Sequence, residues 1–238
     1  MLTLDIDWAP DFMIDQVADI LIQNRVKATW FVTHASPAIG RLREHADLFE
    51  LGLHPNMLAG STHGATEDEA LQHVRKLLPE AIAMRTHGLY QTSNFLIKAA
   101  SDYGVRVDAS LYLPPATHLS PHQVFGEGVT LWRVPYFWED DSEMHRPDSL
   151  WDVDDERLNG PGLRIFDFHP VHIVLNTQGY RRYQELKQGR PLLTWDADYI
   201  KGSQQSGPGP ATMFNGLVDR LAGGGLTISE LIADVEAA

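Results

Sequence analysis

Short apolar stretches alternate with amphipathic stretches along most of the chain. Residues 2–7 form an apolar run typical of a buried strand, and residues 11–25 repeat apolar side chains at helical spacing. The same pattern predicts further strands at residues 27–33, 49–54, 81–88, 105–113, 129–138 and 163–170. It predicts further helices from Ser36 onward, at residues 65–80, 92–103 and 210–221, and after Thr227. The chain is therefore a succession of strand–helix units.

Repeated strand–helix–strand units imply parallel strands that are connected by helical crossovers. The seven predicted strands favour an α/β fold, in which a distorted (β/α)7 barrel or near-barrel is surrounded by outer helices. We find no internal repeat and expect residues 1–238 to form one domain. Polar, glycine- and proline-containing segments predict loops at residues 114–123, 141–162 and 201–210. In such barrels the C-terminal ends of the strands carry the chemistry.

The composition excludes several classes of site and partner. The 238 residues contain no cysteine, which excludes a thiol nucleophile, a disulfide framework and a cysteine-type zinc site. A net charge of −13 argues against nucleic acid or an anionic membrane surface as the main partner. The sequence has neither an apolar run long enough for a membrane span nor a signal-like segment, so we expect a cytoplasmic location. The expected partner is a small-molecule or oligosaccharide substrate, and the oligomeric state stays open.

Two carboxylates stand one residue apart where the first predicted strand ends, in the sequence LTLDIDWAP. Side chains two residues apart share one face of a strand, so we expect Asp5 and Asp7 to lie a few ångströms from each other. Like charges at that separation raise each other's pKa unless a cation or another base lies between them. The pair therefore predicts a cation or a base as its partner.

Further polar side chains fall at the ends of the other predicted strands. His54 ends the third strand, in ELGLH, and Arg85 and His87 end the fourth, in MRTHG. The last two strands lead to an aromatic and acidic run and to two histidines, namely Tyr136, Trp138, Glu139, Asp140 and Asp141, then His169 and His172. Because the carboxyl ends of the strands meet at one rim of a barrel, we interpret this convergence as a site.

A carboxylate together with imidazoles suits a borderline divalent metal ion that keeps water in its open position. Zinc is the first candidate, and nickel, cobalt, manganese and iron are the alternatives. In this interpretation one of the two acids binds the metal, and the other takes the proton of the water. Arg85 would hold the base ionised and oriented.

The sequence resembles the polysaccharide deacetylases, also called the NodB-homology domain or carbohydrate esterase family four, over roughly residues 1–175. The resemblance rests on LDID, ELGLH, the arginine of MRTHG, and FHP. It implies a distorted barrel of seven βα units that uses a divalent metal to hydrolyse N-acetyl groups or related amides. The spacing of the two acids, with a single residue between them, resembles that of the branch that contains allantoinase-like and some peptidoglycan deacetylases.

The resemblance also implies a role for each matching residue. The catalytic residues would be Asp5 as the base, Arg85 as its tether and His169 as the acid that protonates the leaving amine. Three further residues near the rim would contact the substrate, the aromatic ones by stacking on a sugar face: His87, Tyr136 and Trp138.

The third metal ligand is the position at which this sequence departs from the family pattern. The family usually has its second metal histidine four residues after the first, but here that position is Leu58. The next histidine can reach the same metal only if the segment before it is a loop, which its proline and glycines favour. The expected ligands are therefore Asp7, His54 and His63, with His87 as the alternative to His63.

The sequence thus predicts a hydrolase that removes an N-acetyl or related acyl group from a sugar or glycan precursor, with metal-bound water as the nucleophile. Two alternatives stay open. A carbohydrate-binding or regulatory module could keep the barrel without metal or activity, and a cyclic-amide hydrolase of the allantoinase-like branch could use the same site. The metal content of the purified protein separates the first alternative from an enzyme.

Overall fold

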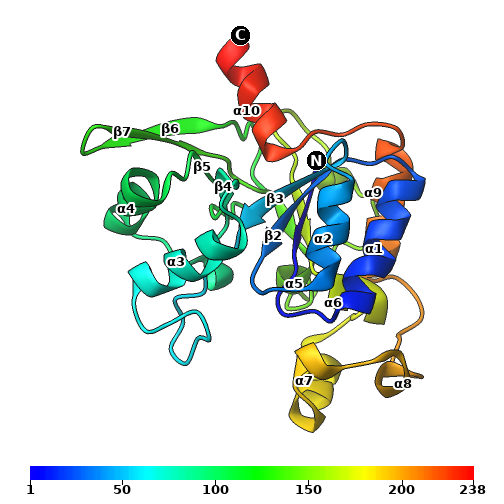
Figure 1. Ribbon diagram of the computed structural model, residues 1–238. Coiled ribbons are helices and arrows are strands. Elements are labelled where there is room, and N and C mark those ends of the chain that lie inside the picture. Colours follow the sequence, from blue (N-terminus) through cyan, green and yellow to red (C-terminus); the bar gives the residue numbers. More distant parts are fainter.

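A nine-stranded, mostly parallel sheet, curled into a half-barrel, forms the centre of the computed structural model, which describes residues 1–238 (Figure 1). Its strands are β1 (Leu2–Asp5), β2 (Ala28–Val32), β3 (Phe49–Leu53), β4 (Ala83–Met84), β5 (Val107–Asp108), β6 (His122–Gly126), β7 (Val129–Arg133), β8 (Trp138–Glu139) and β9 (Phe166–Phe168). They are hydrogen-bonded in the order β6-β7-β5-β4-β3-β2-β1-β9-β8, and only the pair β6–β7 is antiparallel. The prediction of a distorted barrel of parallel strands is confirmed.

Helices connect the strands and lie on the outside of the curled sheet (Figure 1). They are α1 (Asp11–Gln23), α2 (Pro37–Glu44), α3 (Glu67–Leu77), α4 (Ser93–Tyr103), α5 (Asp140–Glu143), α6 (Pro170–Leu175), α7 (Tyr180–Gly189), α8 (Ala197–Ile200), α9 (Pro210–Leu221) and α10 (Ile228–Ala237). Single 3₁₀ turns lie at His87–Leu89, Glu156–Leu158 and Leu192–Thr194. No helix is both long and apolar enough to cross a lipid bilayer.

Capping side chains explain where several helices begin. Thr66 accepts a hydrogen bond from the backbone N–H of Glu69, and the Glu69 carboxylate accepts one from the backbone N–H of Thr66. The same reciprocal capping box, formed by Thr227 and Glu230, starts α10. These caps satisfy backbone donors that a helix start leaves free, so the sequence signals translate directly into local structure.

α10 covers the end of the half-barrel at which the strands begin. The backbone N–H of Ile228 donates to the Thr29 hydroxyl of β2, and Ser229 donates to the carboxylate of Glu50 in β3. Ile228 and Ile232 are buried in a small cluster with Phe31 and other residues of the strands. Because this end is filled by apolar packing, the opposite end, where the strands terminate, remains for a site.

Several segments differ from their predicted structure, and part of the predicted loop 141–162 forms the short helix α5. Residues 129–138 are divided between β7 and β8, and part of the predicted loop 114–123 enters β6. β6 and β7 are joined by the two-residue turn Glu127–Gly128, in which both φ angles are positive (46° and 80°). Such a turn matches the twist of a hairpin. The polar start of β6 hid this edge strand in the sequence pattern.

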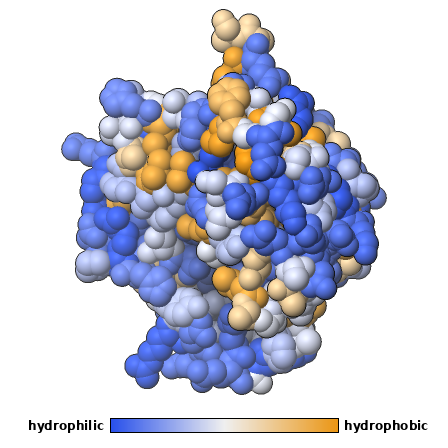
Figure 2. All heavy atoms as spheres, turned by 90° about the vertical axis from the view of Figure 1, so that its left-hand side faces the viewer, coloured by the Kyte–Doolittle hydropathy of each residue, from blue (hydrophilic) through white to orange (hydrophobic).

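The face of the molecule toward α3 and α4 is largely hydrophilic, and its hydrophobic atoms gather in small separate areas (Figure 2). Phe125, in β6, is the most exposed of the large apolar residues at 70%. Scattered apolar residues of this kind are normal on a protein surface.

Candidate active site

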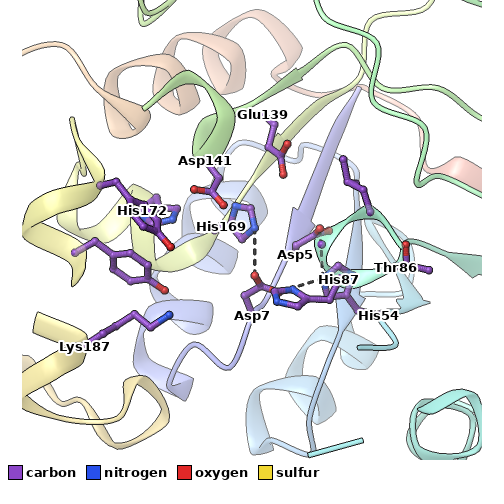
Figure 3. A pocket seen from close by; sticks show the side chains of 14 residues that line it. Asp5, Asp7, His54, Thr86, His87, Glu139, Asp141, His169, His172 and Lys187 are labelled. Carbon is purple, nitrogen blue, oxygen red and sulfur yellow. Dashed lines mark hydrogen bonds and ion pairs between the residues drawn. The ribbon is translucent and has the colours of Figure 1, made fainter. Parts of the chain in front are cut away.

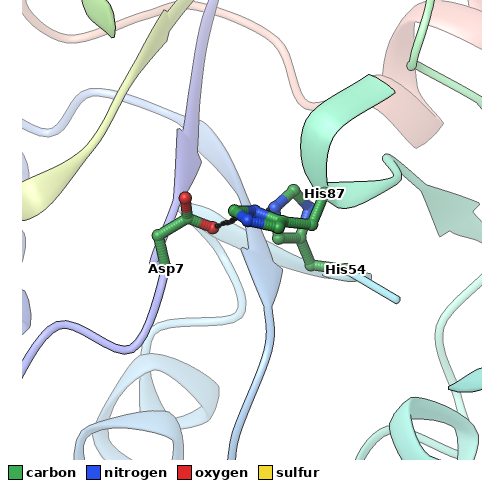
Figure 4. A group of neighbouring side chains, drawn as sticks. All are labelled: Asp7, His54 and His87. Atoms are coloured by element: carbon green, nitrogen blue, oxygen red, sulfur yellow. Dashed lines mark hydrogen bonds and ion pairs between the residues drawn. The ribbon is translucent and has the colours of Figure 1, made fainter. Parts of the chain in front are cut away.

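The chain turns sharply at the end of β1, where the two predicted acids lie. Asp5 is the last residue of β1, and Asp7 and Trp8 follow with positive φ angles of 37° and 57°. Residues other than glycine adopt this left-handed region at an energetic cost, and they concentrate at functional sites. The turn directs the Asp7 carboxylate toward the ends of β3 and β4 (Figure 4).

Asp7, His54 and His87 point toward one another (Figure 4). Asp7 Oδ1 lies 3.0 Å from His54 Nε2 and 3.0 Å from His87 Nδ1. His54 directly follows β3, and His87 begins the 3₁₀ turn that follows β4. The ends of three parallel strands, β1, β3 and β4, therefore bring the three side chains to one point.

The proton on His54 can be located from its hydrogen bond. Its Nδ1 lies 2.8 Å from the backbone oxygen of Arg85, and because a carbonyl can only accept, Nδ1 carries the hydrogen. The buried Nε2 has no hydrogen-bond partner, and in a neutral ring it aims a lone pair at the Asp7 carboxylate. Two electron-rich atoms face each other favourably only when a proton or a cation lies between them.

The pKa shifts of Asp7 and His54 also indicate that positive charge is favoured between them. Burial alone raises the pKa of Asp7, but the charge of His87 and contacts with His169 and His54 bring it well below its usual value. Burial lowers the pKa of His54, yet the negative charges of Asp5 and Asp7 outweigh it and raise the pKa. A divalent cation among these three side chains would supply positive charge next to both carboxylates.

Asp5 is held on the inner side of this group by a buried ion network. Arg85 Nη1 lies 3.0 Å from Asp5 Oδ1 and also pairs with Asp167 on the neighbouring strand β9. The guanidinium is sandwiched between the rings of Phe31 and Tyr136, at 4.6 and 4.4 Å from their centroids. Asp5 Oδ2 remains free of Arg85 and lies 3.5 Å from His54 Nε2. The network thus orients one carboxylate oxygen toward the group of Asp7, His54 and His87.

His169 lies on the other side of Asp7, at the start of α6. Its Nε2 is 3.4 Å from Asp7 Oδ2, and its Nδ1 donates to Asp140 Oδ1 at 2.7 Å. Asp140 Oδ2 also accepts the backbone N–H of His169 at 2.9 Å. Burial lowers the pKa of His169, but Asp140 and then Asp7 raise it well above its ordinary value. The structure therefore favours the protonated form of this histidine.

These groups line a cavity of about 220 Å³ at the C-terminal ends of the strands (Figure 3). Most of the side chains around it are polar or charged, including Asp5, Asp7, His54, His87 and His169. Glu139 also lines it, and burial, with the charge of Asp167, raises the pKa of that carboxyl group to about 8. α7 closes the remaining side with Tyr180, Tyr183 and Lys187.

His63 does not join the group in which we expected it. Its Nδ1 accepts a hydrogen bond from the backbone N–H of Asn56 at 3.0 Å, which occupies the ring's lone pair. The ring stacks on His73 of α3 at 4.4 Å between centroids. Burial and the charge of His73 lower the pKa of His63 to about 4. The loop that carries His63 folds back on α3, and His87 takes the place beside Asp7 and His54 instead.

The expected aromatic contacts with substrate also lie elsewhere. Tyr136 is fully buried against Arg85, and Trp138 is buried at 4.8 Å from the ring of Phe168. Neither side chain reaches the cavity, because both pack into the interior of the sheet and its helices. Their assignment as stacking platforms does not agree with this geometry.

Several residues of the site carried only a weak signal in the sequence. Asp167 is a single acid inside the apolar run FDF, and Asp140 stands in an acidic run that is usually a solvated face. Both are fully buried and pair with Arg85 and His169, respectively. The interruption of an apolar strand by Asp167 could have indicated a buried partner for an arginine.

A model of the WbmS-like polysaccharide deacetylases matches residues 2–187. The chain belongs to this family. The predicted resemblance to polysaccharide deacetylases of the NodB type is thereby confirmed. The match extends into α7, which forms one wall of the cavity.

Two solved structures place this WbmS-like chain among related folds. It is 32% identical to WbmS of Bordetella bronchiseptica, described as a candidate polysaccharide deacetylase involved in O-antigen biosynthesis, with a TM-score of 0.80 and coverage of 92% of this chain and 89% of that one. The peptidoglycan deacetylase PdaC of Bacillus subtilis shares the fold at 12% identity, with a TM-score of 0.54 and coverage of 99% and 90%. A comparison with curated protein sequences finds no match.

Proposed function

We propose that the chain is a metal-dependent hydrolase that removes an N-acetyl or related acyl group from a sugar or glycan precursor. Membership of the polysaccharide deacetylases supports the reaction, and the role of the Bordetella protein in O-antigen biosynthesis supports a glycan precursor as the substrate. The observation that carries the proposal is the trio of Asp7, His54 and His87, whose electron-rich atoms converge beside a second carboxylate.

Asp7, His54 and His87 would hold the metal. Two ligands that are each 2.0–2.1 Å from one zinc ion in a tetrahedral site lie roughly 3.3 Å apart, close to the 3.0 Å that separates Asp7 Oδ1 from each imidazole nitrogen. The Nδ1–H of His54 is fixed by a carbonyl, the arrangement that metal-binding histidines normally show. Zinc suits this donor set, and nickel, cobalt, manganese or iron also bind such ligands. When bound, the metal would polarise the acyl carbonyl and make a water molecule more acidic.

Asp5 would act as the base. Its Oδ2 faces the metal-ligand group, while its Oδ1 is held by Arg85. The arginine keeps the carboxylate charged and fixes its orientation without occupying the oxygen that takes the proton. Asp167 of β9 also pairs with Arg85 and would help to neutralise the charge of the guanidinium group.

His169 would protonate the departing amine. Its Nε2 points into the cavity near Asp7, and Asp140 holds the opposite nitrogen. A carboxylate behind an imidazole stabilises the imidazolium form, so the proton needed by the leaving group is already in place. The proposed base and the proposed acid therefore both lie beside Asp7, and ligand atoms of Asp5 and His169 come within 4.8 Å of each other.

Removal and return of the metal test this function. Purified protein is expected to release acetate from N-acetylated sugars, to lose this activity after treatment with a chelator, and to regain it on addition of zinc or another divalent ion. Acetate release and metal content are measured on the same samples. A protein that binds acetylated sugars but releases no acetate in any metal form would support the binding module, and hydrolysis of ring amides alone would support the cyclic-amide hydrolase.

The identity of the third ligand has its own test. His87→Ala is expected to weaken zinc binding by at least about tenfold, because it removes one nitrogen from the ligand group, whereas His63→Ala is expected to leave it unchanged. Calorimetric titration of the chelator-treated proteins measures both affinities. The opposite order of effects would return the third-ligand role to His63 and would require its loop to rearrange.

A further inference from the structure

The segment that closes the cavity is locally basic although the chain as a whole is strongly acidic. Residues 180–190, YRRYQELKQGR, carry four lysines and arginines and a single glutamate, within a chain of net charge −13. α7 occupies most of this segment and supplies Tyr180, Tyr183 and Lys187 to the cavity wall. The cavity therefore has an acidic side on the strands and a cationic side on α7.

Lys187 is the only lysine or arginine among the residues that line the cavity. The other cations of α7 are engaged, since Arg181 and Arg182 both pair with Glu185. Lys187 forms neither an ion pair nor a hydrogen bond, although Asp7 and Asp141 line the same cavity. A lysine that served as a counterion for the acids of the cavity would be expected to contact one of them.

The Lys187 ammonium is nevertheless positioned. It lies 4.9 Å from the centroid of the Tyr183 ring, and that buried ring packs edge-on against His172 at 4.7 Å. Attraction between an ammonium and an aromatic face favours this location. Figure 3 shows Lys187 reaching in from α7, on the side of Asp7 that is opposite to His54 and His87.

Among the walls of the cavity, the α7 side is the one that favours a negatively charged group of the substrate. Asp5 and Asp7 belong to the metal-ligand side, where an anion would be repelled or would compete for the metal. Glu139 repels an anion weakly at neutral pH, because burial raises its pKa to about 8. An anion on the substrate is therefore favoured where the ammonium points, across the cavity from the hydrolysed bond.

We propose that Lys187 is a specificity residue that binds a carboxylate or phosphate of the substrate, so that the preferred substrate is an acidic acylated sugar. This inference rests on the proposed deacetylation, because it places the acyl group at Asp7 and the anion at α7. The negative charge of the substrate comes from either a sugar acid or a sugar phosphate, since both offer negatively charged oxygens to an ammonium group.

Three N-acetylated sugars test the proposal and its two sources. Acetate release is measured from N-acetylglucosamine, from N-acetylglucosaminuronic acid and from N-acetylglucosamine 1-phosphate, with the zinc-loaded protein. At least one acidic sugar is expected to exceed the neutral sugar by about tenfold or more in kcat/KM, as a charge-assisted contact would provide. The sugar that gains identifies the anion.

Substitutions then connect this preference with Lys187. Lys187→Met is expected to bring the ratio of acidic to neutral kcat/KM close to one, and Lys187→Arg is expected to retain most of it. Lys201→Met is the matched control, because Lys201 is also an exposed lysine without an ion pair but lies outside the cavity lining. The control is expected to keep the native ratio.

Each other result has a defined meaning. Equal kcat/KM for all three sugars, or an equal loss on all three in Lys187→Met, would overturn the anion site and leave the deacetylase function standing. Absence of acetate release from every sugar would contradict the deacetylase function for these substrates. In that case calorimetric binding of the same three sugars to wild-type and Lys187→Met protein decides the anion site, which is overturned if the acidic sugars bind no more tightly than the neutral one.

Discussion

Replacing Asp7 with asparagine is expected to abolish tight binding of a divalent metal and, with it, acetate release. The Asp7 carboxylate contributes the only negative charge of the trio, and its Oδ1 lies 3.0 Å from both His54 Nε2 and His87 Nδ1. Asparagine has nearly the same shape but no charge, so the variant isolates the electrostatic contribution to metal binding. We expect zinc affinity to fall by at least about 100-fold, at the upper end of what loss of a supporting residue costs.

Metal titration of the chelator-treated variant measures this prediction directly. Asp47→Asn is a suitable control, because Asp47 is also an aspartate in an ion pair, but it lies on the surface with Arg25. Exposed pairs of this kind contribute little to stability, so the control should match the native protein in metal affinity and turnover. Native zinc affinity in Asp7→Asn would show that the metal is held elsewhere and would remove the basis of the proposed function.

Replacing Asp5 with asparagine is expected to leave metal binding intact and to reduce turnover. The metal ligands remain, so zinc should still bind, but the oxygen that faces the trio can no longer take a proton. General-base catalysis typically contributes about 10²–10⁴-fold, and kcat is expected to fall by a factor in this range. Measurement of kcat together with zinc affinity on the same preparation separates the role of Asp5 from that of Asp7.

Loss of a buried charge also affects the fold, and a second variant accounts for this effect. Asp108 is a fully buried carboxylate at the end of β5, and it pairs with Arg133 at 2.8 Å outside the cavity lining. Asp108→Asn is expected to lower thermal stability, because the partly buried Arg133 loses its charged partner, while metal binding and most of the turnover remain. If Asp5→Asn hydrolyses acetylated sugars at the native rate, Asp5 is not the base.

The buried network around Arg85 explains how Asp5, the proposed base, is held in place. Its charge is removed from water, which is costly, and the cost is offset by two carboxylates and two flanking aromatic rings. The network links the end of β4 to β1 and β9, although β3 and β2 separate β4 from β1 in the strand order, so it spans the inside of the curled sheet. Asp5 is therefore fixed by the framework of the half-barrel itself and not by a flexible loop.

The alternation of strands and helices from β1 to β5 and the rim on which the candidate site lies could be predicted from the sequence. Apolar periodicity places the strands, and the parallel connection that it implies brings Asp5, Asp7, His54, Arg85 and His169 to one rim. This inference needs only the strand period and the rule that parallel strands end on the same side. Both depend on local sequence and on topology, so they do not require knowledge of individual contacts.

The choice between His63 and His87 depended on the tertiary structure. Spacing along the chain cannot show that the Asn56 backbone occupies the lone pair of His63, or that the turn after β4 brings His87 within 3.0 Å of Asp7. Tyr136 and Trp138 likewise appear suited to a sugar in the sequence, but packing against Arg85 and Phe168 buries them. The physical reason is that the neighbours of a side chain in space decide whether its polar atoms or its ring remain available for a ligand. The residue type alone does not decide this.

The wall formed by α7 was also beyond the reach of the sequence pattern. Its apolar positions are few, so the helix depends on Tyr183 and Leu186 packing against the rest of the protein. Sequence alone determined an acidic chain with a distorted barrel of parallel strands, an acid pair and histidines at the strand ends. Only the folded chain decided which histidine completes the trio, which acids support Arg85 and His169, and that Lys187 enters the cavity, because each of these follows from contacts between segments that are far apart in sequence.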